Sequence, residues 1–252
     1  MNSSLHGLCI LNTRPQDQAH QLSQRIREAG GVAIELPTLK IEAAKSNWIN
    51  SLPDLEKIDQ AIFISANAVH YCFTQLNQQH IKWPSSIQVI AIGEGSATAL
   101  QKFGIRVNAI PDMPDSEHLL ALETLQQPEK QNMLLFKGEG GRPLIEEQLM
   151  QRGANLIILK VYQRVIPQIN RQFIQSIWRD DLVDIILLTS EQSLHNLFKL
   201  FDKEAHDWLR DKKWLIISER LAQIASSMKI RNIRVCTPNR VMNTLFDYVN
   251  KD

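Results

Sequence analysis

Residues 133–164, MLLFKGEGGRPLIEEQLMQRGANLIILKVYQR, form the stretch that decides the fold of this chain. Its pattern predicts a buried strand over residues 133–136, a glycine-rich turn, a helix that stops at Gly153, and a second strand that runs to Tyr162. A glycine-rich turn ahead of a helix leaves backbone N–H groups unpaired at the helix N-terminus, where they favour an anionic ligand. A strand–turn–helix–strand unit of this kind is typical of a parallel sheet with helices packed on it.

The same alternation of strands and helices extends through the rest of the sequence. Short apolar runs predict strands at residues 7–11, 32–36, 61–64, 88–92, 105–110, 183–188, 214–217 and 232–236. Apolar residues three or four positions apart predict helices between them, including one near the C-terminus. Residues 38–60 are more polar and predict a connection with a short helix. Such alternation indicates parallel sheets covered on both faces, so the predicted fold class is α/β.

An internal repeat relates two parts of the chain. The segment IFISANAVHYCF is followed 125 residues later by ILLTSEQSLHNLF, which places Ser65 against Ser190. The same offset relates VIAIGEGSATAL to WLIISERLAQIA, and an offset of 123 places Arg14 against Lys137. Short matches arise by chance in any α/β chain, but three segments at a nearly constant offset favour a repeat. We therefore expect two similar α/β domains, each a parallel sheet flanked by helices, with a site between them.

Composition argues against several classes of function. The chain has 252 residues and a net charge of +1 with no basic run, so nothing predicts nucleic acid binding. Its seven histidines are scattered, which predicts no metal site, and its three distant cysteines indicate reduced thiols, as in the cytosol. No apolar run approaches the roughly 18 residues of a membrane span. The first residues lack a basic start and a cleavage site. We therefore expect a cytoplasmic protein that does not bind membranes.

Short polar residues stand where the predicted strands end and the helices begin. Ligands of open α/β sheets gather at the carboxyl ends of the strands, and each helix N-terminus there favours an anion by roughly 0.3–1 kcal/mol. Several such turns would suit a ligand with many carboxylates or phosphates, although plain helix capping explains any one of them alone. The cations near the turns have solvated surface positions as their alternative. The turn residues are Thr13, Ser65, Ser96, Thr189 and Ser218, and the cations are Arg14, Lys137, Arg164 and Arg220.

A nucleotide site is the obvious rival for these turns. The run Gly93-Glu94-Gly95-Ser96-Ala97-Thr98 resembles the dinucleotide fingerprint G-x-G-x-x-G, but Thr98 stands where the third small residue belongs. The run that begins at Gly138 fails at the same place, where it has Pro143. No G-x-x-x-x-G-K-[ST] sequence occurs in the chain. The sequence therefore gives dinucleotide or triphosphate binding little support.

Taken together, the segments resemble the uroporphyrinogen-III synthase family from Leu11 to about Leu245. Each motif is short and degenerate, but their order and spacing together are fairly specific. At Lys137 bacterial members commonly carry arginine, so this chain keeps the charge and loses the bidentate fork. The matching residues are Thr13-Arg14, Ser65-x-Asn67-Ala68-Val69, Gly93-x-x-Ser96-Ala97, Gly138-x-Gly140-Gly141-Arg142, Arg152-Gly153-Ala154, Val161-Tyr162-Gln163-Arg164, Thr189-Ser190 with Asn196-Leu197, and Ser218-x-Arg220-x-Ala222.

The resemblance implies a discontinuous domain in place of two sequential halves. Residues 1–37 and 166–252 would form one α/β domain, and residues 42–161 would form a second domain inserted into it. Residues 38–41 and 162–165 would be the two linker segments, with the site in the cleft between the domains. Tyr162 would then be a hinge residue that overlooks the cleft.

The resemblance also implies a lyase reaction of haem biosynthesis. The substrate would be hydroxymethylbilane, a linear tetrapyrrole with eight carboxylates, which loses water and closes with ring D inverted through a spiro intermediate. No metal or organic cofactor is implied, because loss of the hydroxyl itself leaves an electrophilic azafulvene. Tyr162 would be the proton donor to the departing hydroxyl. The candidate substrate-binding residues are Thr13, Arg14, Ser65, Asn67, Gly93, Ser96, Lys137, Gly140, Thr189, Ser190, Ser218 and Arg220.

Two other classes of function remain open on the sequence alone. A non-catalytic two-domain protein would bind a polyanionic small molecule at the same turns and turn nothing over. A nucleotide-dependent transferase or oxidoreductase would show saturable nucleotide binding. The resemblance favours the synthase, which we expect to be a monomer, and it is compatible with transient contact with the preceding pathway enzyme.

Overall fold

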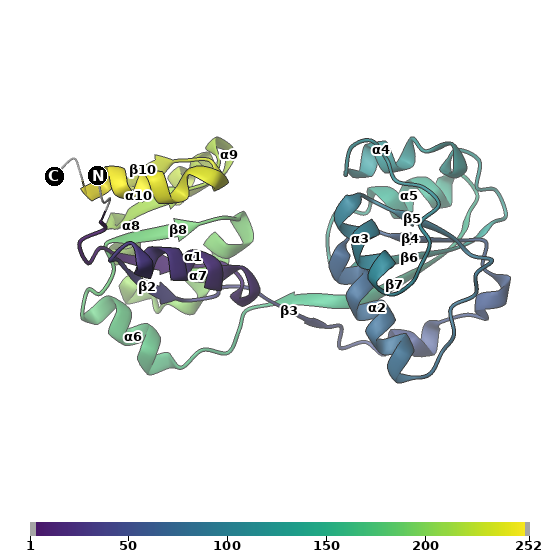
Figure 1. Cartoon of the computed structure of the whole chain (residues 1–252), viewed down its shortest axis with the longest axis horizontal. Helices are drawn as coiled ribbons and strands as arrows, with labels where there is room; N and C mark the ends of the chain where they lie inside the picture. The colour runs from purple at the N-terminus through teal and green to yellow at the C-terminus, as the bar shows by residue number, and fades with distance from the viewer. Residues whose placement is uncertain (1–3, 250–252) are drawn as a thin grey trace. The chain divides into compact units, whose positions relative to one another are not determined.

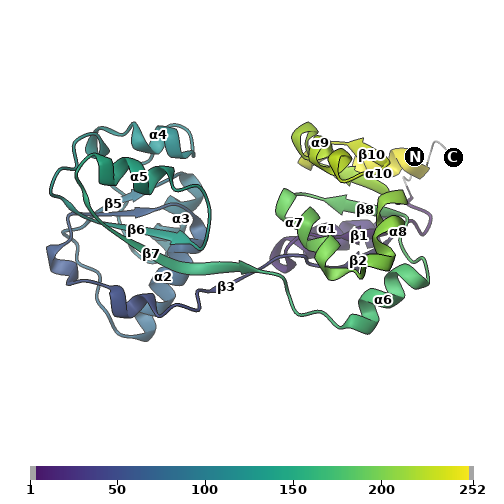
Figure 2. The same ribbon diagram turned by 180° about the vertical axis from the view of Figure 1, so that it is seen from behind.

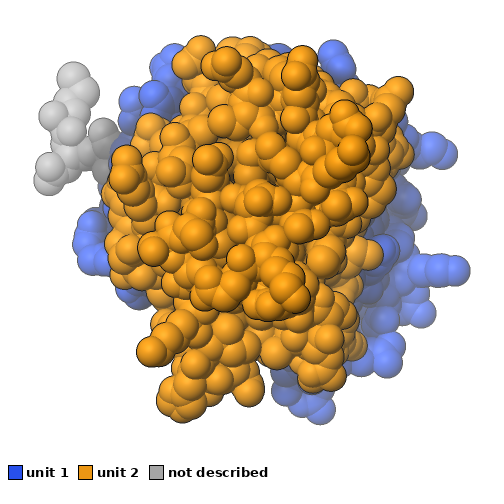
Figure 3. Space-filling model, turned by 90° about the vertical axis from the view of Figure 1, so that its right-hand side faces the viewer, with its two compact units in different colours: residues 1–40, 165–252 blue, residues 41–164 orange. Residues whose placement is uncertain are grey.

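The structure is a computed structural model that describes residues 4–249 (Figure 1). Its contacts divide the chain into two compact units. Unit 1 consists of Met1–Lys40 and Val165–Asp252, and unit 2 consists of Ile41–Arg164 (Figure 3). Among the described residues, no helix is both long enough and apolar enough to cross a membrane.

Unit 1 is built on a five-stranded sheet of order β10-β9-β8-β1-β2, in which all the neighbouring strands are parallel. Alternate residues of each strand enter different cores: Ile10 packs with α1 and α10, whereas Leu11 packs with α6, α7 and α9. Helices therefore cover both faces of the sheet (Figures 1 and 2). The strands are β1 (Cys9–Asn12), β2 (Val32–Glu35), β8 (Ile185–Leu188), β9 (Lys213–Ile216) and β10 (Asn232–Val235). The helices are α1 (Gln16–Glu28), α6 (Arg171–Arg179), α7 (Glu191–Leu200), α8 (His206–Asp211), α9 (Glu219–Ser227) and α10 (Val241–Val249).

Unit 2 contains a five-stranded sheet of order β3-β7-β6-β4-β5. The pairs β4–β5, β4–β6 and β6–β7 are parallel. Phe63 and Phe136 face the core under α2, and Ile62 and Leu135 face the core under α4 and α5. The strands are β3 (Lys40–Ala43), β4 (Gln60–Phe63), β5 (Gln88–Ala91), β6 (Asn132–Gly138) and β7 (Asn155–Val165). The helices are α2 (Ala66–Gln78), α3 (Glu94–Lys102), α4 (Ser116–Leu120) and α5 (Leu144–Gln151), with short 3-10 turns before α2 and after α4.

The two units share a four-stranded core, which confirms the repeat expected from the sequence. The offset of 125 residues relates the first residues of β4 and β8, Gln60 and Ile185, and those of α3 and α9, Glu94 and Glu219. The order β9-β8-β1-β2 in unit 1 corresponds to β5-β4-β6-β7 in unit 2. The α/β class, with two similar units of parallel strands and flanking helices, is confirmed.

The prediction of a strand at residues 105–110 is wrong. The backbone there makes only an isolated bridge between Ile90 and Ala109. Its apolar residues do pack against the core of unit 2, which explains the strand-like pattern. The Asn108 side chain, however, accepts the Val89 N–H at 2.8 Å, so a side chain takes a bond that a regular ladder would make.

Candidate active site at the carboxyl ends of the strands

Three serines of the predicted site are helix N-caps at the carboxyl ends of strands. Ser65 follows β4 and accepts the Ala68 N–H at 3.0 Å, and Ser190 follows β8 and accepts the Ser193 N–H at 3.1 Å. Ser218 follows β9 and accepts the Leu221 N–H at 3.3 Å. Capping therefore occupies a lone pair of each hydroxyl. The remaining backbone N–H groups of each first turn point out at the strand edge where ligands of such sheets bind.

Thr13 does not cap a helix, which was the alternative to ligand binding at each turn residue. It is fully buried, and its hydroxyl donates to the Leu187 carbonyl at 2.6 Å, which ties the end of β1 to β8. Its own carbonyl accepts a hydrogen bond from the Thr38 hydroxyl at 3.2 Å. The N-cap of α1 is Pro15, which has no side-chain cap. Thr13 therefore shapes the turn from inside, and its hydroxyl is already engaged.

Gly93 and Ser96 lie at the start of α3, beside a pocket of about 650 Å³. Gly93 is the N-cap, and Ser96 lies within the first helical turn and is buried. A Cβ atom on Gly93 would lie 2.7 Å from the Pro114 Cβ, so close packing requires glycine here. The same pocket is lined by the carboxylates Glu94 and Asp112, so a carboxylate bound here would depend on the backbone N–H groups of the first turn of α3.

The glycine loop, residues 138–141, connects β6 to the turn before α5. Gly140 and Gly141 have φ of 76° and 87°, the left-handed region in which glycine carries no Cβ penalty. Both residues are exposed. The helix starts at Leu144 without a side-chain cap. The strand, glycine turn and helix predicted from the sequence are all present, and the loop backbone is accessible to a ligand.

Tyr162 lies in β7 with its phenol held by several neighbours. The residue is only 3% exposed, and its ring stacks beside Tyr71 at a centroid distance of 6.0 Å. The phenol oxygen is 3.2 Å from the Ser65 hydroxyl and accepts a hydrogen bond from Arg164 Nη2 at 3.2 Å. A Cβ atom on Gly138 would lie 2.5 Å from the Tyr162 Cζ, so the ring rests directly against the glycine backbone. A catalytic candidate, a predicted turn serine and the glycine loop thus meet within unit 2.

Of the four cations near the turns, the three predicted to bind substrate have different surroundings. Lys137 is buried and its ammonium binds the buried Glu146 carboxylate, so the ligand-binding role expected for it competes with an internal ion pair. Arg220 is largely exposed and pairs with Glu191 at 3.2 Å, an ion pair that solvent screens strongly. The Arg14 guanidinium is half-buried and has no hydrogen-bond or ion-pair partner among residues 4–249. Arg14 is therefore the cation most available to a carboxylate.

Burial changes the pKa of the groups around Arg14. Desolvation lowers the pKa of the Arg14 guanidinium, and the nearby Cys236 thiol acts in the opposite direction. Desolvation also raises the pKa of the Cys236 thiol, which Arg14 partly offsets.

Cys9, Cys72 and Cys236 are all free thiols. Within the described part of the chain, no group of three or more His, Cys, Asp or Glu side chains is arranged to hold a metal ion.

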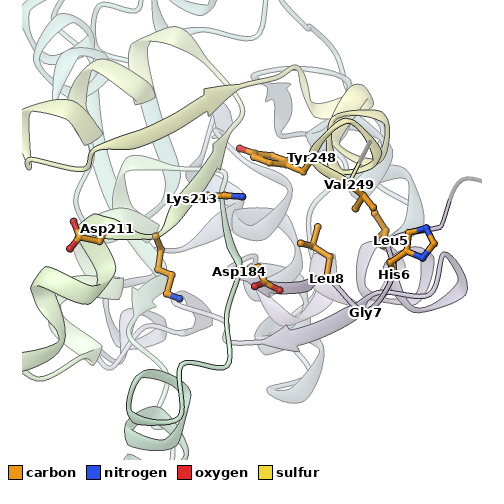
Figure 4. Close-up of a pocket in the computed structure, with 10 residues that line it drawn as sticks. Leu5, His6, Gly7, Leu8, Asp184, Asp211, Lys213, Tyr248 and Val249 are labelled. Atoms are coloured by element: carbon orange, nitrogen blue, oxygen red, sulfur yellow. The ribbon is translucent and has the colours of Figure 1, made fainter. Parts of the chain in front are cut away.

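A pocket of about 500 Å³ in unit 1 lies at the amino ends of the strands (Figure 4). Leu8 precedes β1, Asp184 precedes β8, and Lys213 begins β9. The Asp184 carboxylate there accepts the Cys9 N–H at 2.7 Å. Because ligands of parallel α/β sheets gather at the opposite ends of the strands, this pocket is not part of the candidate site.

The remaining predicted residues lie at the same strand ends. Thr189 directly precedes the Ser190 cap, and Asn67 lies in the first turn of α2; both are half-buried. Sequence reasoning did not include Gly138 as a site residue and placed Arg164 only among the nearby cations. The signal for Gly138 was the glycine at the end of a predicted strand, but its contact with a residue 24 positions later required the structure.

The fold and these turns define a class: a two-unit parallel α/β protein with capped helix N-termini at the carboxyl ends of its strands. A crystal structure of a mutant uroporphyrinogen III synthase from the extremely thermophilic bacterium Thermus thermophilus has the same fold, with a TM-score of 0.64 and 15% identity over 97% of this chain and 98% of that one. The uroporphyrinogen-III synthetase structure from Helicobacter pylori 26695 gives a TM-score of 0.58 at 16% identity, over 96% and 98% of the two chains.

Sequence comparison gives the family. The family profile described as Uroporphyrinogen-III synthase HemD matches residues 20–243. The uroporphyrinogen-III synthase of Escherichia coli (strain K12) is 31% identical over 232 residues, which cover 90% of this chain and 94% of that protein. The uroporphyrinogen-III synthase of Proteus mirabilis is 36% identical over 183 residues, 71% and 92% of the two chains. The chain belongs to the uroporphyrinogen-III synthase family, a family of lyases in tetrapyrrole biosynthesis.

Proposed function

We propose that Tyr162 donates a proton to the departing hydroxyl when this chain converts hydroxymethylbilane into uroporphyrinogen III. The observation that supports this role is the position of its phenol, which lies beside the Ser65 cap and against Gly138. Loss of the hydroxyl leaves an electrophilic azafulvene, and the substituted carbon of ring D attacks it to give a spiro intermediate. That intermediate fragments and closes again with ring D inverted.

The substrate carboxylates would be held by helix N-termini and by Arg14. Hydrogen bonds to a charged group contribute roughly 1.5–3 kcal/mol each, so a few turns suffice to orient a molecule with eight carboxylates. Orientation is the main requirement, because the substrate is already activated and each tenfold preference for one isomer costs only about 1.4 kcal/mol. We assign this binding to Arg14 and Arg220, to the glycine loop at Gly140, and to the turns at Thr13, Ser65, Asn67, Gly93, Ser96, Thr189, Ser190 and Ser218.

The domain organisation and state of the protein are part of the same proposal. Residues 1–37 with 166–252, and residues 42–161, would be the two domains, joined by residues 38–41 and 162–165. The protein would act as a cytoplasmic monomer that makes transient contact with the preceding pathway enzyme. Sedimentation at micromolar concentration, alone and with that enzyme, tests both statements: a stable dimer contradicts the first, and an unchanged boundary in the mixture contradicts the second.

The test of the catalytic role supplies freshly generated hydroxymethylbilane, oxidises the products and separates the uroporphyrin isomers by chromatography. The intact protein should give the type III isomer, whereas the blank gives type I. Tyr162→Phe keeps the ring and removes the proton, and should lower kcat by about 10²-fold, the lower end of general acid catalysis. Unchanged turnover and isomer ratio in this variant would remove Tyr162 from the mechanism.

A further inference from the structure

The side chain of Arg164 lies against the phenol of Tyr162 in a way that bears on proton donation. Its Nη2 atom is 3.2 Å from the phenol oxygen, and its Cζ atom is 5.5 Å from the centre of the ring. Arg164 is exposed and Tyr162 is buried, and the two side chains meet at the phenol oxygen. No ion pair involving Arg164 is present among the described residues, which leaves its charge directed at Tyr162.

The chemistry of these groups restricts the hydrogen bonds that they make. A guanidinium has only donors, so the phenol oxygen must accept from Arg164. On its other side, the Ser65 hydroxyl already accepts the Ala68 N–H at 3.0 Å and lies 3.2 Å from the phenol oxygen. When Ser65 also donates, both lone pairs of the phenol oxygen are occupied. The phenol proton is then left without a partner in the protein and is available to the substrate.

Arg164 also meets the charge that the reaction creates. As the C–O bond of the hydroxymethyl group breaks, the hydroxyl takes the electron pair of that bond, accepts the phenol proton and leaves as water. The phenol oxygen keeps the electron pair of its O–H bond and becomes negative. The pyrrole that loses the hydroxyl keeps its N–H proton, so the azafulvene forms in its protonated, cationic state, and the proton released from ring D on closure restores the phenol. A guanidinium already in place stabilises the negative oxygen without reorganisation.

We infer that Arg164 is a positioning residue for Tyr162, which keeps the phenol as a proton donor and stabilises its oxygen once the proton has left. The inference rests on the proposed role of Tyr162. Arg164 contacts the phenol of Tyr162 and acts on the substrate only through that phenol. Arg164 should therefore affect the rate of the chemical step and leave substrate affinity nearly unchanged.

Steady-state kinetics of Arg164→Met, which keeps the length of the side chain and removes charge and donors, test this inference. Loss of a charge-assisted hydrogen bond should lower kcat about tenfold or more and leave KM within about twofold. Arg164→Lys restores charge and donor, and should recover kcat to within about threefold of the intact protein. Arg106→Met, at an exposed arginine of the same unit without a hydrogen bond among the described residues, should leave kcat and KM unchanged.

The double variant with Tyr162→Phe separates this inference from the proposed function. If Arg164 acts through the phenol, adding Arg164→Met to Tyr162→Phe lowers kcat no further. Losses that multiply, together with a raised KM, would show that Arg164 binds a substrate carboxylate instead and would overturn the inference. A normal kcat in Arg164→Met together with a lowered kcat in Tyr162→Phe would overturn only the inference on Arg164. A normal kcat in Tyr162→Phe would overturn both that inference and the proposed role of Tyr162. Equal thermal unfolding midpoints of the single variants exclude loss of folding as the cause.

Discussion

The two units share four strands but differ where the corresponding strand pairs end. In unit 1, β2 has 4 residues and stops at Glu35, in register with the end of β1. In unit 2, the strand that corresponds to β2 is β7, which has 11 residues and continues past the end of its neighbour β6. The register shifts between Lys137 and Gly138, so that Gly138 is paired with Tyr162. The repeat thus supplies the common strand ends, and the lengthened strand of unit 2 adds the proposed catalytic residue.

The cations at corresponding positions differ in a second way. The guanidinium of Arg14 in unit 1 is half-buried and has no hydrogen-bond partner among residues 4–249. Lys137 of unit 2 is buried and binds Glu146. A free guanidinium favours ligand binding, whereas a buried ion pair constrains the strand and helix that carry it. Equivalent positions in the two units therefore need not have the same role: one cation is available to a ligand and the other forms an internal ion pair.

Removal of the Glu146 carboxylate should have the largest effect on stability. Glu146→Ala leaves the Lys137 ammonium buried without its partner, which typically costs about 3–5 kcal/mol. One Glu146 oxygen has no hydrogen bond, so the pair is imperfectly satisfied. The double change Lys137→Met with Glu146→Leu should therefore restore most of the free energy of unfolding. Urea unfolding measures both.

Arg14→Met is the matched control for this pair. Because the Arg14 side chain makes no internal hydrogen bond in the described part of the chain, its replacement should change the free energy of unfolding by less than about 0.5 kcal/mol. Equal destabilisation by Arg14→Met and Glu146→Ala would contradict the contrast between the two units.

Gly138→Ala should damage both stability and catalysis. The new Cβ would lie 2.5 Å from the Tyr162 Cζ and 2.9 Å from its oxygen, so the ring must move. Overpacking of this kind costs about 1–3 kcal/mol, and a displaced phenol should lower kcat by about 10²-fold. Tyr162→Ala removes the ring, so Gly138→Ala should no longer destabilise the protein in that background. Additive losses of stability would show that the glycine is needed for another reason.

The sequence predicted the elements of the shared core better than the differences between the units. Local patterns place the caps at Ser65, Ser190 and Ser218. In each case an apolar strand, a serine and an amphipathic helix follow one another, and this order marks where the helix begins. The alternation of strands and helices also indicated the α/β class, and the repeat indicated the corresponding strands. These features depend on neighbouring residues, which the sequence displays directly.

Contacts between distant residues could not be predicted in the same way. The partner of Lys137 is nine residues away across a loop, and the Thr13 hydroxyl bonds to a carbonyl 174 residues away. The strand expected at residues 105–110 failed because Asn108 replaces a backbone bond, which hydrophobic alternation does not reveal. Only folding shows which polar side chains are occupied and which remain available to a ligand.

Arg14→Met should weaken substrate binding. A charge-assisted hydrogen bond to a carboxylate contributes roughly 1.5–3 kcal/mol, so KM should rise about tenfold to a hundredfold, with kcat within about threefold. Steady-state rates over a range of hydroxymethylbilane concentrations measure this split. Arg106→Met again serves as the control for loss of a surface arginine. A fall in kcat alone would place Arg14 nearer the reacting atoms than the carboxylates.

The corresponding caps Ser65 and Ser190 should have equal effects on stability and unequal effects on turnover. Either change to alanine removes one helix cap and should cost about 1 kcal/mol in the free energy of unfolding. Only Ser65 lies within hydrogen-bond distance of Tyr162, at 3.2 Å, so Ser65→Ala should also lower kcat, by about threefold to tenfold. Urea unfolding and initial rates on both variants give the comparison. Equal kcat values would show that the Ser65 contact does not serve catalysis.

The smallest effect is expected at a surface carboxylate of unit 1. Hydrogen bonds from Lys212 and then from Trp208 lower the pKa of Asp181. A lowered pKa in the folded state gives stability that is present above the unfolded value and is lost as pH falls through the folded pKa. Asp181→Asn is the suitable change, because φ at residue 181 is 49° and asparagine tolerates this conformation.

Urea unfolding of the intact protein and of Asp181→Asn between pH 7 and pH 2.5 measures this contribution. At pH 6 the intact protein should be more stable, by less than about 1 kcal/mol, because the Asp181 side chain is 67% exposed and solvent screens its charge. The difference should shrink toward zero as the carboxyl is protonated below pH 4. In unit 2, Asp115→Asn should follow the same direction, because a hydrogen bond from the His118 backbone N–H lowers the pKa of Asp115. A difference between intact protein and Asp181→Asn that stayed constant with pH would show that charge at Asp181 is not the cause. It would assign the effect to the neutral hydrogen bonds that asparagine fails to reproduce.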